Sequence, residues 1–252
     1  MTYNILLQTI SDRYLEILGN NLTGIYVHGS IAFNCFSWDN SDIDFIVVVE
    51  HKISRQDKLD LLNVLHQLNS QAPVKGFEMS VVQLKYCKHF VYPTPFELHF
   101  SNAHLQEYLD NPLALCTDDI KIDPDLAAHF TVINHAGIVL YGKPIPEVFG
   151  DVPKADYIDS IRLDIENAIQ DVLHSPVYVV LNLCRVYGFL KDGLVLSKKD
   201  GGQWGIDNLP EQYRAVVAES VDSYMLSKPL YLDDGARISF CQYMLESIFA
   251  EI

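Results

Sequence analysis

Two aspartates stand at the start of the most apolar segment of this chain. Asp42 and Asp44 are two residues apart at the start of the segment 41–49. The segment ends in the run Phe-Ile-Val-Val-Val, and this apolar run predicts a buried β-strand. Alternate residues of a strand share one face, so both carboxylates are expected on the same side. Two neighbouring acids at the edge of a buried strand repel each other unless a cation lies between them, and carboxylate oxygens suit hard divalent cations. The alternative is a solvated, aspartate-rich turn before a core strand.

The segment before these acids predicts a phosphate-binding site. Residues 23–28 predict a strand rich in β-branched and aromatic side chains, and this strand leads directly into Gly29 and Ser30. A glycine lets backbone N–H groups approach a ligand, a helix start favours anions, and the serine hydroxyl adds a donor. Together with Asp42 and Asp44, the pattern indicates a site for a nucleoside triphosphate with Mg²⁺. The glycine patterns of P-loop and Rossmann nucleotide sites do not occur in the sequence.

The Gly-Ser and Asp-x-Asp pair resembles the nucleotidyltransferase superfamily of DNA polymerase β. Further segments narrow the resemblance to the bacterial aminoglycoside O-adenylyltransferases, and within them to the streptomycin/spectinomycin adenylyltransferases. These segments are residues 77–82, 92–100, 123–127, 179–185 and 209–213, with Lys198 and Trp204. The resemblance extends over nearly the whole chain. It implies an antibiotic-resistance enzyme that transfers AMP from ATP to a hydroxyl group of an aminoglycoside-like cation and releases pyrophosphate.

The same resemblance implies roles for individual residues. Asp42 and Asp44 would hold Mg²⁺, and Glu78 would be the general base that takes the proton from the attacking hydroxyl. Glu78 lies within a predicted strand, where a carboxylate beside the Asp-x-Asp strand would complete a site of three acids. The alternative for Glu78 is an outward-facing side chain on a half-exposed sheet. Glu97 is not assigned to catalysis. Its alternatives are a partner in a salt bridge and a residue at the start of a helix.

Three residues of the C-terminal half match positions that contact the nucleotide in the resembling family. Arg185 lies at the polar edge of a predicted helix, and Lys198 follows a loop at the start of the next segment. Both match positions that contact phosphates in that family. Arginine can bridge two phosphate oxygens, and lysine acts as a point charge. Tyr224 also matches a nucleotide contact. For isolated Arg and Lys residues, the alternative is an ordinary surface charge.

The chain departs from the family where the acceptor would bind. The streptomycin/spectinomycin enzymes have a tryptophan that stacks on streptomycin and an acid before the helix that contains Arg185. Here the matching stretches are Phe-Ser-Asn-Ala-His at 100–104 and Leu-His-Ser-Pro at 173–176, and Asp171 is displaced from the acid's position. Loss of one stacking plate and one counter-charge would reduce streptomycin binding by roughly a few kcal/mol. Spectinomycin is then the favoured acceptor, and another hydroxylated amine is the alternative. Asn34 and Cys35 also replace glycines that the family tends to have after the Gly-Ser pair.

Composition narrows the class of partner. The formal net charge of −15 opposes binding to nucleic acid and is suited to the attraction of a cationic small molecule. The alternative is that the acidic residues only keep the protein soluble. No apolar stretch is long enough to span a membrane, and the N-terminus lacks the features of a signal peptide, so we expect a cytoplasmic protein. We also expect it to be a monomer. The cysteines are scattered, which indicates reduced thiols in the core. They are Cys35, Cys87, Cys116, Cys184 and Cys241.

The order of elements predicts an α+β fold. Residues 1–150 are expected to form a nucleotidyltransferase domain with a mixed sheet flanked by helices, and residues 151–252 a helical bundle that completes the nucleotide and acceptor site. The first half alternates helices and strands. Helices are predicted at 5–18, 55–68, 154–173, 177–190, 211–226 and 234–250, and strands near 24–28, 43–49, 77–83 and 96–100.

Two other functions remain open from the sequence. One is a nucleotidyltransferase of the toxin–antitoxin type that modifies a protein or an RNA end, although the acidic composition argues against RNA. The other is a catalytically inactive nucleotide sensor with the same fold. The presence of Asp42, Asp44 and Glu78 argues against a degenerate site.

Overall fold

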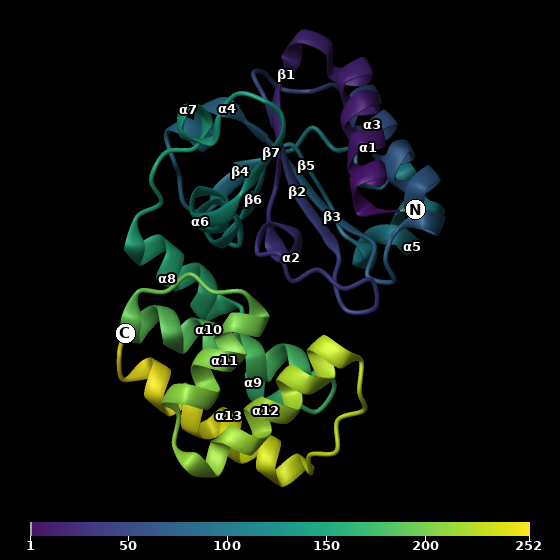
Figure 1. The fold of residues 1–252 in the computed structure, drawn as a ribbon. Helices are drawn as coiled ribbons and strands as arrows, with labels where there is room; N and C mark the ends of the chain where they lie inside the picture. Colours follow the sequence, from purple (N-terminus) through teal and green to yellow (C-terminus); the bar gives the residue numbers. More distant parts are fainter. Residues whose placement is uncertain (1) are drawn as a thin grey trace. The chain divides into compact units, whose positions relative to one another are not determined.

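The computed structural model describes residues 2–252, and the chain divides into two compact units, Met1–Tyr157 and Ile158–Ile252 (Figure 1). The predicted α+β class is confirmed, because the first unit holds a mixed sheet with helices and the second consists of helices. The division falls within helix α8 (Lys154–Leu163), a little beyond the boundary expected at residue 150. Among residues 2–252, no helix is long and apolar enough to cross a membrane.

The main sheet of the first unit has five strands in the order β5-β3-β2-β1-β7. The strands are β1 (Leu22–Val27), β2 (Ile43–Val49), β3 (Phe77–Gln83), β5 (Leu98–Phe100) and β7 (Ile138–Gly142). Strands β2 and β3 are parallel, and the other neighbours are antiparallel. The predicted strand at 96–100 is divided, because β4 (Thr94–Phe96) pairs instead with β6 (Lys121–Asp123) in a separate small sheet.

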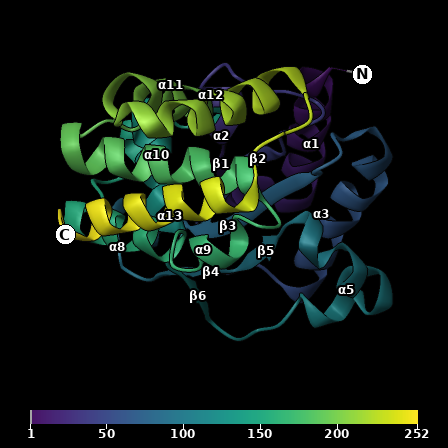
Figure 2. The ribbon, with the colours of Figure 1, turned by 90° about the horizontal axis from the view of Figure 1, so that it is seen from below.

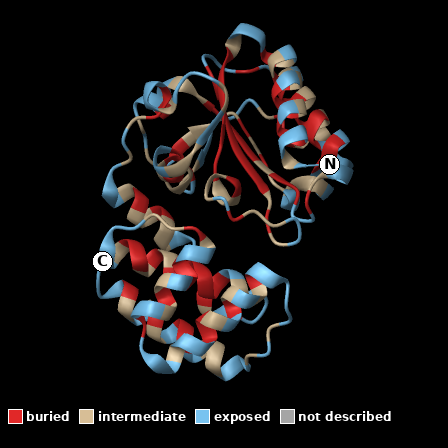
Figure 3. Ribbon diagram, in the orientation of Figure 1, coloured by how far each residue is buried: buried red, intermediate tan, exposed pale blue. Residues whose placement is uncertain are grey.

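Helices cover both faces of this sheet. Helices α1 (Tyr3–Leu18) and α3 (Arg55–Leu68) lie on one face, and α6 (Leu126–Ala136) lies on the other (Figure 1). Every residue of β1 and β2 is therefore buried (Figure 3), which explains why their sequences are almost continuously apolar. The remaining helices of this unit are short: α2 (Gly29–Ala32), α4 (Leu84–Lys88), α5 (Leu105–Asp110) and α7 (Ile145–Val148).

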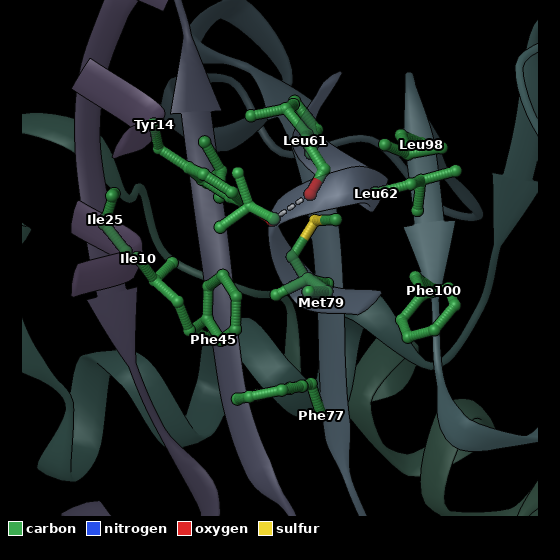
Figure 4. Close-up of a cluster of buried hydrophobic side chains, with 14 of the residues drawn as sticks. Ile10, Tyr14, Ile25, Phe45, Leu61, Leu62, Phe77, Met79, Leu98 and Phe100 are labelled. Atoms are coloured by element: carbon green, nitrogen blue, oxygen red, sulfur yellow. Dashed lines mark hydrogen bonds between the residues drawn. The ribbon is translucent and has the colours of Figure 1, made fainter. Parts of the chain in front are cut away.

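The larger core forms between the sheet and helices α1 and α3 (Figure 4). Phe45 and Met79 project from the strands toward Ile10 and Tyr14 of α1, and all four side chains are fully buried. The Tyr14 hydroxyl donates to the backbone carbonyl of Leu61 at 3.3 Å, so its polar atom is satisfied within the core. The two helices are thereby joined by a hydrogen bond as well as by packing.

A buried ion pair supports the edge of the sheet. The Lys58 ammonium lies 3.5 Å from the Glu97 carboxylate, with side chains 1% and 10% exposed. Lys58 also donates to the Thr117 carbonyl at 2.8 Å, and Gln83 donates to Glu97. Glu97 is thus a salt-bridge partner, one of the two alternatives that the sequence left open for it.

The second unit is built around helix α10, which packs against α11, α12 and α13 (Figure 2). The bounds are α9 (Ala168–Asp171), α10 (Pro176–Asp192), α11 (Lys198–Asn208), α12 (Glu211–Leu226) and α13 (Asp234–Phe249). The predicted helix 154–173 is interrupted, since α8 ends at Leu163 and α9 begins only at Ala168. All five cysteines of the chain are buried free thiols, as predicted.

Helix α11 was not predicted, because three glycines lower its helix propensity. The same glycines allow close packing on α10. A Cβ atom at Gly201 would lie 2.6 Å from Cγ of Arg185, and one at Gly205 would lie 2.7 Å from Sγ of Cys184. Tertiary packing therefore stabilises a helix that its own sequence disfavours.

Candidate active site

Three carboxylates converge at the start of β2. Asp42 directly precedes the strand, Asp44 lies within it, and Glu78 is the register partner of Asp44 on the parallel strand β3. One oxygen from each side chain lies within 4.8 Å of the others. Asp44 is only 8% exposed, whereas Asp42 and Glu78 are half-buried. The structure thus brings together the three acids that the sequence placed on two separate strands.

The end of β1 brings Gly29 against these acids. The backbone N–H of His28 donates to the Asp44 carbonyl at 3.0 Å, so the chain leaves β1 beside Asp44. Gly29 then adopts φ +60°, a left-handed backbone conformation that is unfavourable for residues with a Cβ atom. A Cβ atom at this position would also collide with the Asp44 carboxylate, 2.7 Å from its Cγ. Glycine is therefore required here for both backbone conformation and space.

The predicted phosphate-binding turn at Gly29 and Ser30 leads into a shorter helix than expected. Helix α2 comprises only Gly29–Ala32, a single turn, so the dipole of a long helix is not available to attract anions. The donors that remain are backbone N–H groups and the hydroxyl of Ser30. Within residues 2–252, the buried Ser30 Oγ has no hydrogen-bond partner. An unsatisfied buried hydroxyl is costly, and a phosphate oxygen would satisfy it.

The loop after α2 shows how the chain manages without the family's glycines. Asn34 adopts φ +54°, and asparagine is one of the few residues that tolerate this left-handed conformation. The backbone N–H of Cys35 then donates to the Ser30 carbonyl at 2.9 Å and closes the turn. The substitutions at these two positions therefore preserve a tight turn next to Ser30.

A histidine of helix α6 adjoins the acids and was not expected from the sequence. His129 Nε2 lies 3.2 Å from a carboxylate oxygen of Asp125 and 3.8 Å from Oε1 of Glu78. The ring centroids of His129 and His28 are 4.6 Å apart. Local sequence offered no signal for this contact, because Asp125 belonged only to a segment that carried the resemblance and α6 was not predicted as a helix.

His129 and the two histidines that it influences differ in protonation. Burial lowers the pKa of His129, but the carboxylates of Asp125, Glu78 and Asp123 together raise it by more. The resulting pKa is about 10, above the ordinary value of 6.5. Burial and the neighbouring His129 hold the pKa of His28 well below its usual range. Burial, followed by His129, lowers the pKa of His99 to about 4. At neutral pH, His129 is therefore the charged member beside two neutral rings.

His99 makes the stability of the protein sensitive to acid. Its folded-state pKa is about 4 against an ordinary value of 6.5. The unfolded chain takes up this proton first, so stability is complete above pH 6.5 and is lost as pH falls toward 4. We expect a loss of about 2 kcal/mol between pH 6.5 and pH 5 from this residue, measured by urea unfolding at both values.

The His99→Gln variant should show a smaller loss over the same interval. His51→Gln, at an exposed position, is the matched control and should retain the full loss. An equal loss of stability in His99→Gln and in the unmodified protein would contradict this assignment.

The candidate phosphate contacts of the second unit lie on adjacent helices. On α10, Arg185 donates through Nε to the Leu196 carbonyl at 2.9 Å and through Nη1 to Asn182 at 3.2 Å. Lys198, the first residue of α11, has its ammonium 4.6 Å from the centre of the Tyr178 ring. Tyr224 is a buried side chain of α12. The nucleotide contacts of Arg185, Lys198 and Tyr224 stay predictions.

The mixed sheet and the three acids at the start of its parallel strands agree with the arrangement that the resemblance implies for a nucleotidyltransferase. Comparisons with known proteins agree. Residues 147–247 match the family model of the aminoglycoside adenylyltransferase C-terminal domain. A solved structure described as spectinomycin adenyltransferase AAD(9) from Enterococcus faecialis with ATP and spectinomycin superimposes with a TM-score of 0.84. It is 19% identical and covers 99% of this chain and 100% of its own.

Curated relatives cover most of the chain. An aminoglycoside (3'') (9) adenylyltransferase from Rhizobium radiobacter is 28% identical over 90% of this chain and 87% of its own length. A similar enzyme from Klebsiella pneumoniae is 26% identical over 86% and 82%. A spectinomycin 9-adenylyltransferase from Staphylococcus aureus is 24% identical over 79% and 76%. The chain is thus a homologue of the aminoglycoside adenylyltransferases and an enzyme of the nucleotidyltransferase class, as its sequence predicted.

Proposed function

We propose that this protein transfers AMP from ATP to a hydroxyl group of an aminoglycoside-like cationic small molecule, with spectinomycin preferred over streptomycin. The observation that carries this proposal is the convergence of Asp42, Asp44 and Glu78 within 4.8 Å beside Gly29. Relatives named as adenylyltransferases support it, and so does the fold of a neighbour that binds ATP and spectinomycin. We further propose that the protein acts in the cytoplasm as a monomer, without nucleic acid or membrane partners.

The donor set fits Mg²⁺. Asp42 and Asp44 supply carboxylate oxygens, the ligand type that Mg²⁺ prefers, and these two side chains would hold the ion. When bound, the ion would supply positive charge that offsets the charge of the triphosphate and of the leaving pyrophosphate. Gly29 and Ser30 adjoin these acids, so their donors are available to phosphate oxygens.

Glu78 would act as the general base. Its carboxylate takes the proton of the acceptor hydroxyl while the hydroxyl oxygen forms a bond to the α-phosphorus of ATP. The bond from that phosphorus to the bridging oxygen breaks, and pyrophosphate leaves with the bond's electron pair. The products are an AMP ester of the acceptor, pyrophosphate and a protonated Glu78 that returns its proton to solvent. Arg185, Lys198 and Tyr224 are the proposed nucleotide contacts of the second unit.

The preference for spectinomycin rests on what occupies the family's acceptor positions. Phe100 lies in the strand β5 and is 3% exposed, so its ring belongs to the core and offers no stacking surface. Asp171, at the end of α9, is exposed and does not replace the missing acid before α10. The net charge of −15 still attracts cations in general.

Incubation with ATP labelled at the α-phosphate tests the proposal. We expect label on spectinomycin, with one pyrophosphate released per AMP transferred, and at least about tenfold less transfer to streptomycin because the stacking plate is missing. The Asp42→Asn/Asp44→Asn protein is the control and should transfer no label. Absence of AMP transfer to every aminoglycoside and aminocyclitol of a broad panel would contradict the proposed function.

A further inference from the structure

Glu78 lies between two groups of side chains. On one side are Asp42 and Asp44, and on the other are Asp125 and His129; each group, together with Glu78, places its ligand atoms within 4.8 Å of one another. Glu78 is the member that the two groups share. The proposed base therefore has two competing neighbours, a site for a cation and a fixed imidazole ring.

Packing holds the imidazole in place. His129 lies on α6, between Leu126 and Phe130, which are fully buried against the sheet together with Ile133. The ring of His28 lies against the His129 ring with centroids 4.6 Å apart. Asp125, one helical turn earlier, accepts from Nε2 at 3.2 Å. The ring consequently has little freedom to turn away from Glu78.

A role in packing alone does not account for His129. Its side chain is only 15% exposed, and its buried Nδ1 has no hydrogen-bond partner within residues 2–252. A leucine would fill this position on an apolar helix face without the cost of an unsatisfied nitrogen. The polar contacts that the ring does make, through Nε2, are to Asp125 and Glu78.

We propose that His129, anchored by Asp125, is a positioning residue that holds Glu78 away from the cation site, so that Glu78 serves as the base and not as a third metal ligand. This inference rests on the proposed function of the same site. A carboxylate whose oxygens coordinate a cation has none left to take a proton, whereas one held by a single oxygen toward the Nε2–H of His129 keeps the other oxygen for the acceptor hydroxyl. The Nε2 to Glu78 distance of 3.8 Å leaves room for this contact to tighten when substrate binds.

Two substitutions of His129 separate positioning from packing. His129→Leu removes the donor and keeps the volume, and His129→Gln keeps an N–H donor. We expect His129→Leu to lower kcat about 10- to 100-fold, with KM for ATP and for spectinomycin within about twofold, and His129→Gln to recover most of the loss. Asp125→Asn, which weakens the anchor, should change kcat in the same direction by a smaller factor.

Binding of Mn²⁺ alone to the full chain provides a readout that does not depend on activity. If Glu78 becomes a third ligand when His129 is lost, His129→Leu should bind Mn²⁺ about threefold to tenfold more tightly than the unmodified protein, measured by titration of the free-ion electron paramagnetic resonance signal. The added substitution Glu78→Gln should abolish this gain. His135→Leu, at an exposed position of the same helix, is the matched control and should leave both kcat and Mn²⁺ affinity unchanged.

Unchanged Mn²⁺ affinity in a folded His129→Leu protein would overturn the inference, as would a gain that persists with Glu78→Gln. A failure of His129→Gln to recover kcat would overturn it too. If the panel shows no AMP transfer but Mn²⁺ affinity rises as expected, the proposed function fails while the placement of Glu78 by His129 stands. Thermal unfolding confirms that each variant is folded before it is titrated.

Discussion

Glutamine in place of Glu78 is expected to lower the rate of AMP transfer by about 10²- to 10⁴-fold, the usual contribution of a general base. The amide keeps the size of the carboxylate but cannot take the proton of the acceptor hydroxyl. The side chain is half-buried near the start of β3 and its residue pairs in register with Asp44, so the substitution leaves the backbone of β3 in place. Single-turnover transfer from labelled ATP measures the chemical step directly, and KM for ATP should change little because Asp42 and Asp44 remain.

The matched control for this prediction is Glu50→Gln. Glu50 is exposed and directly follows β2, so the same chemical change is made just beyond the end of the neighbouring strand, away from the acids. The control should transfer AMP at the unmodified rate. A Glu78→Gln protein that retains transfer within about threefold of that rate would show that another group takes the proton.

Alanine in place of Gly29 is expected to lower AMP transfer by about 10²-fold or more. The new Cβ would meet the Asp44 carboxylate, so either Asp44 or the turn must move, and a displacement of about 1 Å at a reacting centre costs this much. The left-handed backbone at φ +60° adds a loss of stability of roughly 1–2 kcal/mol. Measured quantities are kcat, Mn²⁺ affinity and the midpoint of thermal unfolding, and Mn²⁺ affinity should fall because Asp44 shifts.

Gly193 provides a close control for the backbone effect. It is left-handed at φ +70°, and a Cβ atom there would meet nothing within 4 Å. Gly193→Ala should therefore lose a similar amount of stability through backbone strain while retaining AMP transfer and Mn²⁺ affinity. Equal activity in the two variants would contradict the claim that Gly29 is needed for close approach to Asp44.

Long apolar runs were the most predictable parts of the fold. Strands β2 and β3 match the predicted ranges 43–49 and 77–83. Burial on both faces makes the sequence of β2 nearly continuous in apolar residues, whereas β3 interleaves Glu78, Ser80 and Gln83 with buried apolar residues. Strand β7 was not predicted. It is an edge strand with mostly exposed or half-exposed residues, and it is defined by its pairing with β1, which no local pattern records.

The candidate site was predictable where its residues are close in sequence. Asp42 and Asp44 are two residues apart, and the alternation of a strand relates them. Glu78 was placed with them through a resemblance and a strand pattern, and its alternative was an exposed position on the sheet. His129 and Asp125 were missed because their relation to Glu78 depends on how α6 packs across the sheet.

The amino-acid sequence by itself determined the class of this protein, the paired aspartates, the Gly-Ser turn and the buried strands that carry them, because these features depend on neighbours along the chain. Only the tertiary structure decided that Glu78 faces Asp44, that Gly29 presses against the same carboxylate, and that His129 adjoins the proposed base. The physical reason is that strand pairing and helix packing join residues far apart in sequence. Such contacts are selected by the burial of whole surfaces and not by any local pattern.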